Sequence, residues 1–591
     1  MKTFDDIQAK FKAFLKRLPE RRLMMLLSIV VGAACGFAAV ILKSLVGLIH
    51  SGVSSLGNSW IYFVCPGIGM LISLLFVRFV IKDDIGHGVT KVLQAVSKNE
   101  SRIKPHNMWS SIVASSFTIG FGGSVGAEAP IVYTGAAIGS NVGRFMELSY
   151  KNITLLLGCG AAGAVAGIFN APLAGILFTL EILLFNISMS SIIPLLFSSV
   201  SATVISCLFL GNDLTFACNI EPFAMRNIGF YILLGLFCAV CSLYFTRMTL
   251  WLEDKIKAID KVWVRWLIAS LILGLLIFLF PPLWGEGYDS LAPLLGGTQI
   301  TAQGNSFLSF FLESKWGILV LFALVIILKV FSMSLTNAGG GVGGTFGPTL
   351  FVGAIAGFVL ARFLNLIFAK SAITIPEQNF VMVGMAGLMA GVMQAPMTAI
   401  FLIAEITGGY DLLIPLILTA TVSYGATRAV EPYSIYTKRI AKAGELLTHD
   451  NDKTILTLLK VDNILRDKYP RISVDATLGE LVDIISESQA QVFPVVDSDD
   501  KFMGLIEMDK IRKLMFQTDK YDSVRVFNIM EAPAAYLYQN ESMASVMDKF
   551  DKTGAWRLPV VTGENHYYLG FVSKSRIFSA YREELKEISQ D

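Results

Sequence analysis

Charge is scarce over most of this 591-residue chain. The sequence has 48 basic and 46 acidic residues, but only 42 of these charges fall in the 426 residues of Leu23–Thr448. In a chain that is 54% hydrophobic with a mean hydropathy of +0.61, such a stretch excludes a single soluble enzyme, a disordered chain and a fibrous protein. Another 42 charges lie in the 143 residues of His449–Asp591. The sequence therefore predicts an integral membrane domain followed by a soluble domain.

Other absences narrow the function. The net charge is only +2, which argues against nucleic acid as a partner. All seven cysteines precede Leu250, so the soluble part has neither a disulfide framework nor a cysteine metal site. The one Cys-x-x-Cys, Cys238–Cys241, lies in an apolar run, and we interpret it as two packing residues. Clustered metal ligands and a nucleophile–base arrangement are also missing, so we do not expect an enzyme.

The N-terminus is basic. The first 22 residues carry seven basic and three acidic side chains, which places this end of the chain in the cytoplasm. The apolar run from Leu23 is long and has no convincing small-residue cleavage site, so we do not interpret it as a signal peptide. A helical membrane span needs about 20 apolar residues. Good candidates begin near Leu23, Trp60, Ile228, Trp266 and Ile318.

Two further apolar stretches, Asn152–Phe185 and Phe380–Ile406, are interrupted by Gly, Asn and Pro. Interrupted spans are tolerated in lipid only where protein or a polar cavity satisfies the freed backbone groups, so we expect broken helices that meet inside the protein. Within these stretches, Gly163–Ile182 and Gly387–Ile406 are identical at eight of twenty positions. Two related halves with broken helices are typical of transporter folds with a site near the bilayer midplane. The predicted fold class is a polytopic α-helical membrane protein with an inverted internal repeat.

The soluble part also contains a repeat. Two short apolar strands, Val492–Val496 and Leu558–Val561, recur about 66 residues apart. Each lies between two helical stretches; the four stretches are Thr477–Ser486, Lys510–Phe516, Ser542–Phe550 and Arg576–Glu584. Thr477 and Glu480 are spaced to form a capping box at the start of the first stretch. Strands that alternate with helices in this way predict a pair of small α/β modules.

Three glycine-rich loops lie in the membrane part: Gly86–Thr90, Gly123–Pro130 and Gly341–Pro348. The second and third end in a shared Gly-x-x-x-Pro pattern, one in each half. A helix that starts in such a loop presents unpaired N–H groups and the positive end of its dipole. Two or three such ends that converge would hold an anion without a full positive charge, so the anion is also able to leave. A phosphate-binding loop is excluded, because no Lys-Ser/Thr follows the glycines.

Glu128 stands in the second of these loops. An acidic residue inside a membrane domain is costly and is a functional candidate by default. When ionised it would occupy the anion's place at a helix N-terminus, and when protonated it would swing away. Glu128 is therefore a candidate gate worked by protons. The alternative is a fixed acidic residue at a helix start.

These loops, their order, the related halves and the paired C-terminal modules resemble the CLC family of chloride channels and anion/proton exchangers. The resemblance runs from about Leu23 to the C-terminus, and the paired modules resemble CBS domains. Gly126–Pro130 is similar to the family's Gly-Lys/Arg-Glu-Gly-Pro. This match implies that Glu128 is the external gating glutamate, with Ala127 and Ala129 beside it at anion-binding positions.

Two further segments carry the resemblance. Gly344–Pro348 is similar to the family's Gly-x-Phe-x-Pro, which implies that the backbone amides of Thr345 and Phe346 contact the central anion. Ser434-Ile-Tyr-Thr437 resembles the segment that bears the anion-contacting tyrosine. We place that role on Tyr436, for which Tyr433 is a poorer fit.

The chain departs from the family pattern at its site residues. His87 replaces the serine whose hydroxyl contacts the anion, and an imidazole donates one hydrogen bond when neutral and two when protonated. Ala127 stands in place of the basic residue before the gating acid, and Ala129 in place of the glycine after it. Ile182 occupies the position where the exchangers often carry an internal proton-transfer glutamate, and isoleucine carries no proton.

Two transport mechanisms stay open. Ile182 favours passive, channel-like conduction of chloride or a similar small anion, whereas Glu128 favours anion/proton exchange, with water or His87 as the inner proton source. We prefer uncoupled conduction. A CBS-bearing divalent-cation transporter is a distant alternative, because it would need several intramembrane carboxylates as ligands and the loops offer one.

The predicted domains are a basic cytoplasmic N-terminus (residues 1–22), an anion-transport domain (23–445) and two CBS-like modules (446–523 and 524–591). Nucleotide-binding CBS modules commonly end a strand with Ser/Thr-x-Asp, and this chain has half-matches that include Asp509 and Ser573. The pair is therefore either an adenine-nucleotide sensor or a scaffold, and we expect no required cofactor or metal. The resemblance implies a homodimer in the plasma (inner) membrane with both termini in the cytoplasm.

Overall fold

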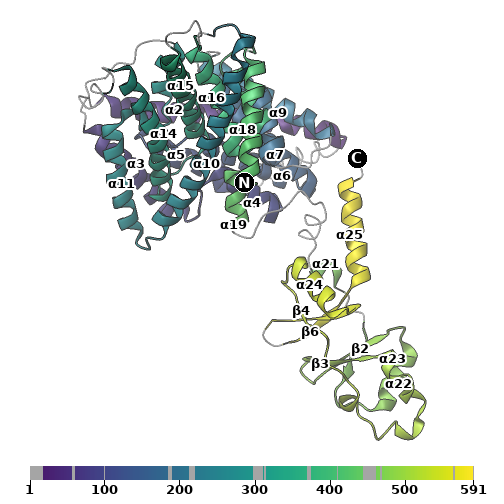
Figure 1. The fold of residues 1–591 in the computed structure, drawn as a ribbon. Helices are drawn as coiled ribbons and strands as arrows, with labels where there is room; N and C mark the ends of the chain where they lie inside the picture. Colours follow the sequence, from purple (N-terminus) through teal and green to yellow (C-terminus); the bar gives the residue numbers. More distant parts are fainter. Residues whose placement is uncertain are drawn as a thin grey trace, which may run out of the picture. The chain divides into compact units, whose positions relative to one another are not determined.

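The structure is a computed structural model, and it describes residues 18–55, 60–98, 100–183, 189–211, 220–296, 311, 314–368, 374–408, 410–442, 461–465, 469–563 and 566–589. Most of the basic N-terminus (1–22) and the boundary near residue 445 lie outside these ranges. The chain divides into two compact units, Met1–Leu446 and Leu447–Asp591, and each is described by itself (Figure 1).

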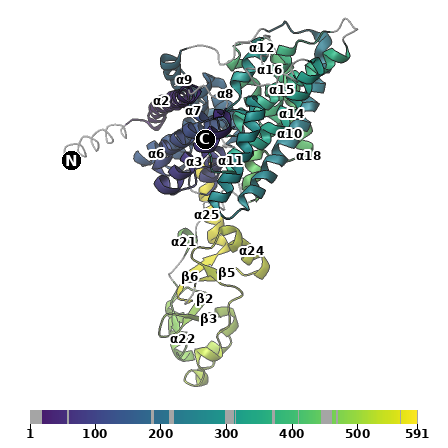
Figure 2. The ribbon, with the colours of Figure 1, turned by 90° about the vertical axis from the view of Figure 1, so that its left-hand side faces the viewer.

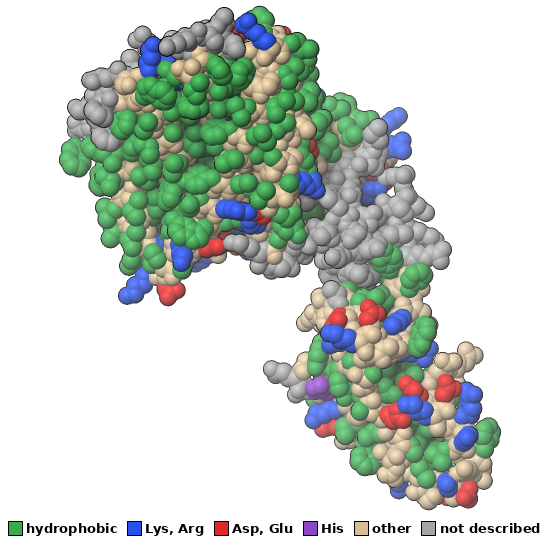
Figure 3. Space-filling model, in the orientation of Figure 1, with side chains coloured by type: hydrophobic (Ala, Val, Ile, Leu, Met, Phe, Trp, Pro, Cys, Tyr) green, Lys and Arg blue, Asp and Glu red, His purple; other side chains and the backbone are tan. Residues whose placement is uncertain are grey.

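The first unit is built from apolar helices. Among the described residues, nine helices are long and apolar enough to cross a membrane. They confirm the five predicted spans, which extend over Glu20–Ser54, Ile61–Ile81, Met225–Lys257, Val262–Leu279 and Lys315–Ala338. Hydrophobic side chains cover much of the visible face of this unit, whereas Lys, Arg, Asp and Glu are spread over the second unit (Figure 3). The contrast follows the distribution of charge along the sequence.

The helices of the two sequence halves lie in two groups, seen in Figure 2 as purple and blue helices beside teal and green ones. The first half contains α2 (Glu20–Ser54), α3 (Ile61–Leu75), α4 (Gly88–Lys98), α5 (Ser110–Gly120), α6 (Glu128–Phe145), α7 (Tyr150–Phe169), α8 (Pro172–Ile182) and α9 (Met189–Leu210). The second half contains α10 (Ile228–Lys257), α11 (Val262–Leu279), α12 (Tyr288–Gly296), α14 (Lys315–Ala338), α15 (Phe346–Ile367), α16 (Glu377–Met393), α17 (Pro396–Ile406), α18 (Leu413–Val430) and α19 (Ile435–Lys442).

The predicted helix breaks are present at equivalent points of the two halves. Helix α7 is followed by its C-cap Asn170, whose φ is 56°, and α16 is followed by its C-cap Gln394, whose φ is 54°. In both cases a proline then fills the first position of a short helix, α8 or α17, of 11 residues. Left-handed backbone ends a helix and proline favours a new start, so the Asn-Ala-Pro and Gln-Ala-Pro sequences determine the breaks.

The two short helices cap each other through the repeated glutamates. Glu181 at the end of α8 accepts hydrogen bonds from the N–H groups of Met397 (3.0 Å) and Thr398 (2.7 Å) at the start of α17. Glu405 at the end of α17 accepts from the N–H groups of Leu173 (3.0 Å) and Ala174 (2.9 Å) at the start of α8. A carboxylate is favourable at a helix N-terminus, which gives the repeated glutamate a structural role.

Helices α6 and α15, which follow the glycine-rich loops Gly123–Pro130 and Gly341–Pro348, pack very closely against their neighbours. A Cβ on Gly160 of α7 would lie 1.9 Å from the carbonyl oxygen of Gly135 on α6. In the second half, a Cβ on Gly357 of α15 would lie 1.9 Å from the carbonyl oxygen of Phe380 on α16. Only glycine allows such an approach of two backbones. Cys238 likewise packs on Gly387, where an added Cβ would lie 3.0 Å from its sulfur, as the packing interpretation of Cys-x-x-Cys predicts.

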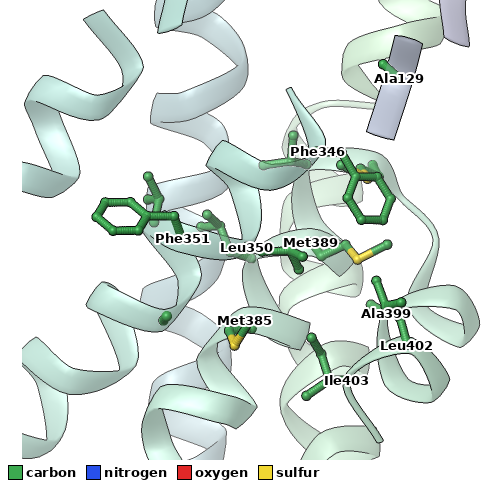
Figure 4. Close-up of a cluster of buried hydrophobic side chains, with 14 of the residues drawn as sticks. Ala129, Phe346, Leu350, Phe351, Met385, Met389, Ala399, Leu402 and Ile403 are labelled. Atoms are coloured by element: carbon green, nitrogen blue, oxygen red, sulfur yellow. The ribbon is translucent and has the colours of Figure 1, made fainter. Parts of the chain in front are cut away.

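The core of the membrane unit lies between these helices. Figure 4 shows part of it, where Leu350 of α15 lies near Met385 and Met389 of α16, while the ring of Phe351 points away from these methionines. All four side chains are fully buried. This apolar support holds the start of α15, where Phe346 lies, in a fixed position.

The second unit contains two three-stranded sheets with equal topology. The first joins β1 (Ile472–Ser473), β2 (Val492–Val496) and β3 (Phe502–Glu507), and the second joins β4 (Leu537–Tyr538), β5 (Arg557–Val561) and β6 (Tyr568–Ser573). In each sheet the first pair is parallel and the second antiparallel. The register shifts at Val495/Val496 and again at Val560/Val561, which is the equivalent position. The predicted pair of related α/β modules is confirmed.

The helices of this unit are α21 (Val461–Ile464), α22 (Leu478–Glu487), α23 (Met508–Ile511), α24 (Met543–Thr553) and α25 (Lys574–Ser589). The predicted capping box of Thr477 and Glu480 is present at α22. One expected helix differs, because Lys510–Phe516 forms only the end of α23 and a 3₁₀ turn at Leu514–Phe516. Short 3₁₀ turns are common connectors after a helix end.

Candidate anion-binding site

The two Gly-x-x-x-Pro loops meet in the structure. Gly126 and Gly344 form an antiparallel bridge, in which the N–H of each donates to the carbonyl oxygen of the other at 3.0 and 2.7 Å. A Cβ on Gly344 would lie 2.7 Å from the Cβ of Ala129, so glycine is required for this approach. Helices α6 and α15 therefore begin side by side. Two helix N-termini from opposite halves of the chain provide unpaired N–H groups at one place.

Glu128 occupies this place. Its side chain is buried, with 2% of the residue exposed. One carboxylate oxygen accepts a hydrogen bond of 3.1 Å from the N–H of Gly347 in the first turn of α15, and the other accepts one of 2.8 Å from the hydroxyl of Tyr288. An acidic side chain from α6 thus lies at the N-terminus of α15, where a helix favours a bound anion.

Two other backbone N–H groups at the start of α15 differ from that of Gly347. Within the described part of the chain, the structure gives no hydrogen-bond partner for the N–H groups of Thr345 and Phe346. Thr345 is the N-cap of α15 and its side chain does not cap the helix. These amides are consistent with the positions predicted to contact an anion.

The structure distinguishes the two candidate tyrosines. Tyr436 of α19 is buried with 2% exposed, whereas Tyr433 is 40% exposed. The Thr345 hydroxyl donates to the Tyr436 oxygen at 3.4 Å, so the two predicted anion contacts lie together. The Tyr436 hydroxyl in turn faces the sulfur of Met393 at 3.9 Å. Sulfur is a weak acceptor, so this donor has no strong partner among the described residues.

The first glycine-rich loop, Gly86–Thr90, reaches the same helix start. A Cβ on Gly88 would lie 2.3 Å from the carbonyl oxygen of Ala129, which places this loop against α6. The adjacent His87 has a φ of 53° and its side chain is 18% exposed. Its Nε2 lies 3.3 Å from a carboxylate oxygen of Glu253 and 3.3 Å from Nζ of Lys257. The His87 side chain therefore joins a charged network with Glu253 and Lys257.

Glu253 links His87 to the helix of Tyr436. The Glu253 side chain is 4% exposed, and its two oxygens accept hydrogen bonds of 2.9 and 3.1 Å from Arg439 of α19. A buried carboxylate needs such partners to offset its desolvation. His87 lies outside the membrane-spanning helices; its burial lowers the pKa of the imidazole, Arg439 lowers it further, and Glu253 acts in the opposite direction.

Other predicted positions fall as follows. Ile182 is buried in the apolar core at the end of α8 and offers no polar atom there. The N–H of Ala127 donates at 2.8 Å to the carboxylate of Glu286. In the soluble unit, Ser573 lines a cavity of about 390 Å³. Asp509 is not in the lining of that cavity, and its exposed carboxylate pairs with Arg512.

Sequence reasoning missed four charged or polar residues of this region: Glu253, Glu286, Tyr288 and Lys329. One signal was available, because an ionisable residue within an apolar segment is rare and functional by default. Lys329 lies in the span Lys315–Ala338, and Glu286 follows the span Val262–Leu279 by only seven residues. Their partners are far away in the sequence, so the signal does not by itself connect them to Glu128.

The geometry agrees with comparisons to known proteins. The family model for voltage gated chloride channels matches residues 68–428, and the CBS domain model matches residues 461–517 and 526–583. The chain is 24% identical over 564 residues to chloride channel protein CLC-e of Arabidopsis thaliana, a match that covers 84% of this chain and 76% of that protein. It is 26% identical over 421 residues to the H(+)/Cl(-) exchange transporter ClcA of Vibrio cholerae, covering 67% of this chain and 84% of that protein.

The fold is similar to solved structures as well. The crystal structure of a slow cyanobacterial Cl-/H+ antiporter superimposes with a TM-score of 0.61 at 23% sequence identity. The similarity covers 72% of this chain and 98% of the antiporter. At this level of identity the likeness concerns the fold.

Proposed function

This chain belongs to the voltage-gated chloride channel (CLC) family of anion transporters, and from that premise we propose that chloride or a similar small anion passes through the site where α6 and α15 begin. One observation carries the proposal. The carboxyl group of Glu128 accepts the N–H of Gly347 at the start of α15, in the position that suits an anion. Glu128 closes the pathway when ionised and opens it when protonated.

We propose that conduction is uncoupled from protons, and anion/proton exchange is the alternative. Ile182 supports uncoupled conduction, because its buried apolar side chain provides no inner proton carrier. The named relatives include both a chloride channel and an exchange transporter.

Liposomes that contain the protein and carry a chloride gradient distinguish uncoupled conduction from anion/proton exchange, if the external pH is recorded during chloride efflux. We expect chloride to leave without proton movement. Protons driven against their gradient in a fixed ratio to chloride would establish exchange, and magnesium flux without chloride flux would overturn anion transport altogether.

Tyr436→Ala is expected to weaken chloride binding more than Tyr433→Ala. The buried Tyr436 hydroxyl lies beside Thr345 and, in the described part of the chain, faces only the weak acceptor sulfur of Met393, whereas Tyr433 is exposed. The loss of one hydrogen bond costs roughly 0.5–1.5 kcal/mol, which is about 2- to 12-fold in Kd. Calorimetric titration with chloride or bromide measures the two values. An equal or reversed order would remove Tyr436 from the pathway.

His87→Ser is expected to change anion flux only at acidic pH on the side that His87 faces. Burial lowers the pKa of the imidazole, so the side chain gains its positive charge only at acidic pH. That charge strengthens anion binding near the site. Flux measured against pH on each side in turn, together with chloride/nitrate preference, tests this role. If neither quantity changes, His87 serves only the ion pair with Glu253.

The paired CBS domains offer one candidate nucleotide site. The cavity at Ser573 is lined also by Tyr469, Phe571, Ser575 and Arg576, which supply aromatic, hydroxyl and cationic groups. We place adenine-nucleotide binding there and not at Asp509. Titration of the full chain with ATP, against an Arg576→Ala variant, decides between this role and a scaffold. If neither protein gives a heat change, the CBS pair acts as a scaffold and not as a nucleotide sensor.

We also propose a homodimer with one pathway per subunit and both termini in the cytoplasm, supported by the family resemblance and by the basic N-terminus. Chemical cross-linking in membranes and the accessibility of tags at the two ends test these points. A protein that stays monomeric, or a tag reached from outside the cell, would contradict them.

A further inference from the structure

A buried lysine fixes the segment that precedes α12. Lys329 of α14 has no exposed surface, and its Nζ donates to the carbonyl oxygens of Leu283 (3.3 Å) and Gly285 (2.8 Å). Its Nζ also lies 4.9 Å from the centre of the Phe351 ring. A charged group inside a membrane domain needs such partners. Lys329 therefore holds residues 283–288, which we call the outer loop, in a defined conformation.

The outer loop also relies on two glycines. Gly285 has a φ of 54° and Gly287 a φ of 92°, values that favour glycine. A Cβ on Gly287 would lie 2.6 Å from the Phe351 ring. These two residues stand on either side of Glu286, so the backbone turn directs that side chain.

The outer loop places two side chains on the gate. The Glu286 carboxylate accepts the N–H of Ala127 at 2.8 Å, at the N-cap of α6. The Tyr288 hydroxyl donates to the Glu128 carboxylate at 2.8 Å, while the other Glu128 oxygen accepts the N–H of Gly347. One carboxylate thus lies at the start of each of the two helices that meet here, Glu286 at α6 and Glu128 at α15.

The charges around Glu286 come from three helices. Lys43 of α2, Lys329 of α14 and Glu128 of α6 interact electrostatically with it. Two nearby carboxylates repel each other when both are ionised, so a proton on one favours ionisation of the other. Their protonation is therefore linked.

We propose that Glu286 is a second acidic gate residue, which blocks the N-terminal amide of α6 when ionised and releases it when protonated, and that Tyr288 positions Glu128 in the closed state. This inference rests on the proposed function. The proton comes from the adjoining aqueous solution and returns to it. An anion that reaches the amides of both helices must displace both carboxylates, so opening depends on two protons.

Chloride efflux from liposomes, measured against pH on each side in turn, tests the proposal with Glu286→Gln, Glu128→Gln and the double variant. We expect Glu286→Gln to make the pH profile less steep and to raise flux at neutral pH about tenfold. Glu128→Gln is expected to keep a shallow pH dependence, which the double variant loses. Tyr288→Phe is expected to move the midpoint upward by about one pH unit, because it removes a hydrogen bond that favours ionised Glu128.

Glu405→Gln is the matched control, since it neutralises another helix-capping carboxylate away from α6 and α15, and its profile should equal that of the wild type. A wild-type profile in Glu286→Gln, together with a flat one in Glu128→Gln, overturns the role of Glu286 and leaves the proposed function intact. If the Glu128→Gln variant instead keeps the pH profile of the wild type, Glu128 is not the gate and the proposed function is wrong.

A second variant covers the case in which Glu286→Gln does not fold. Glu286→Asp keeps the charge, but its shorter side chain does not reach the Ala127 N–H. We expect it to conduct more than the wild type at neutral pH and to show a less steep pH profile, because Glu128 alone still blocks the pathway. An unchanged profile in a variant that elutes like the wild type overturns the proposal.

Discussion

Glu128→Gln is expected to raise anion flux at neutral pH by about tenfold or more and to remove most of its dependence on pH. The ionised carboxylate is held closed by the Gly347 N–H and the Tyr288 hydroxyl. A hydrogen bond to a charged group contributes roughly 1.5–3 kcal/mol, and about 1.4 kcal/mol corresponds to a factor of ten. A neutral amide loses the charge and imitates the protonated gate at every pH.

The measurement is chloride efflux from liposomes between acidic and neutral pH. Glu405→Gln again serves as the control for neutralising a helix-capping glutamate. A Glu128→Gln protein with the pH profile of the wild type would show that Glu128 is the fixed helix-start acid of our alternative interpretation. A shallow remaining dependence agrees with a second titrating group at Glu286.

Gly160→Val is expected to be the most damaging single substitution for the folded membrane unit. The new Cβ would lie 1.9 Å from the carbonyl oxygen of Gly135, 2.6 Å from the carbonyl carbon of Gly135 and 3.2 Å from the backbone nitrogen of Gly139. Overpacking of a core costs about 1–3 kcal/mol even where side chains are able to move. Here the obstacle is backbone, so α6 and α7 must separate. Since α6 begins at Glu128, the gate is displaced as well.

Gly425→Val is the matched control. Gly425 also lies inside a helix that is long and apolar enough to cross a membrane, α18, but a Cβ there meets nothing within 4 Å. Both variants place the same β-branched residue in a helix, so propensity cancels. We expect thermal unfolding followed by size-exclusion chromatography in detergent to show a melting temperature several degrees lower for Gly160→Val alone. Equal melting temperatures would contradict the close α6–α7 contact.

The sequence by itself determined the partition of the chain and much of its local structure. Membrane spans, helix breaks, the capping box and the strands of the soluble modules depend on the composition and order of neighbouring residues, which are visible in one dimension. The three glycine-rich loops were also visible. That Gly126 and Gly344 pair directly with each other was visible only in the structure.

Only the tertiary structure decided which distant side chains complete the site. Tyr288 is 160 residues from Glu128, and Glu286 is 159 residues from Ala127. Hydropathy and spacing carry no information on such pairs, because they arise from how α6, α12, α14 and α15 pack. The same is true of Glu253, which lies 186 residues from Arg439 and connects His87 to the helix of Tyr436. The glycine-rich loops can be recognised in the sequence. The side chains that hold Glu128 and His87 in place come from helices that are remote in the sequence and meet only when the chain packs.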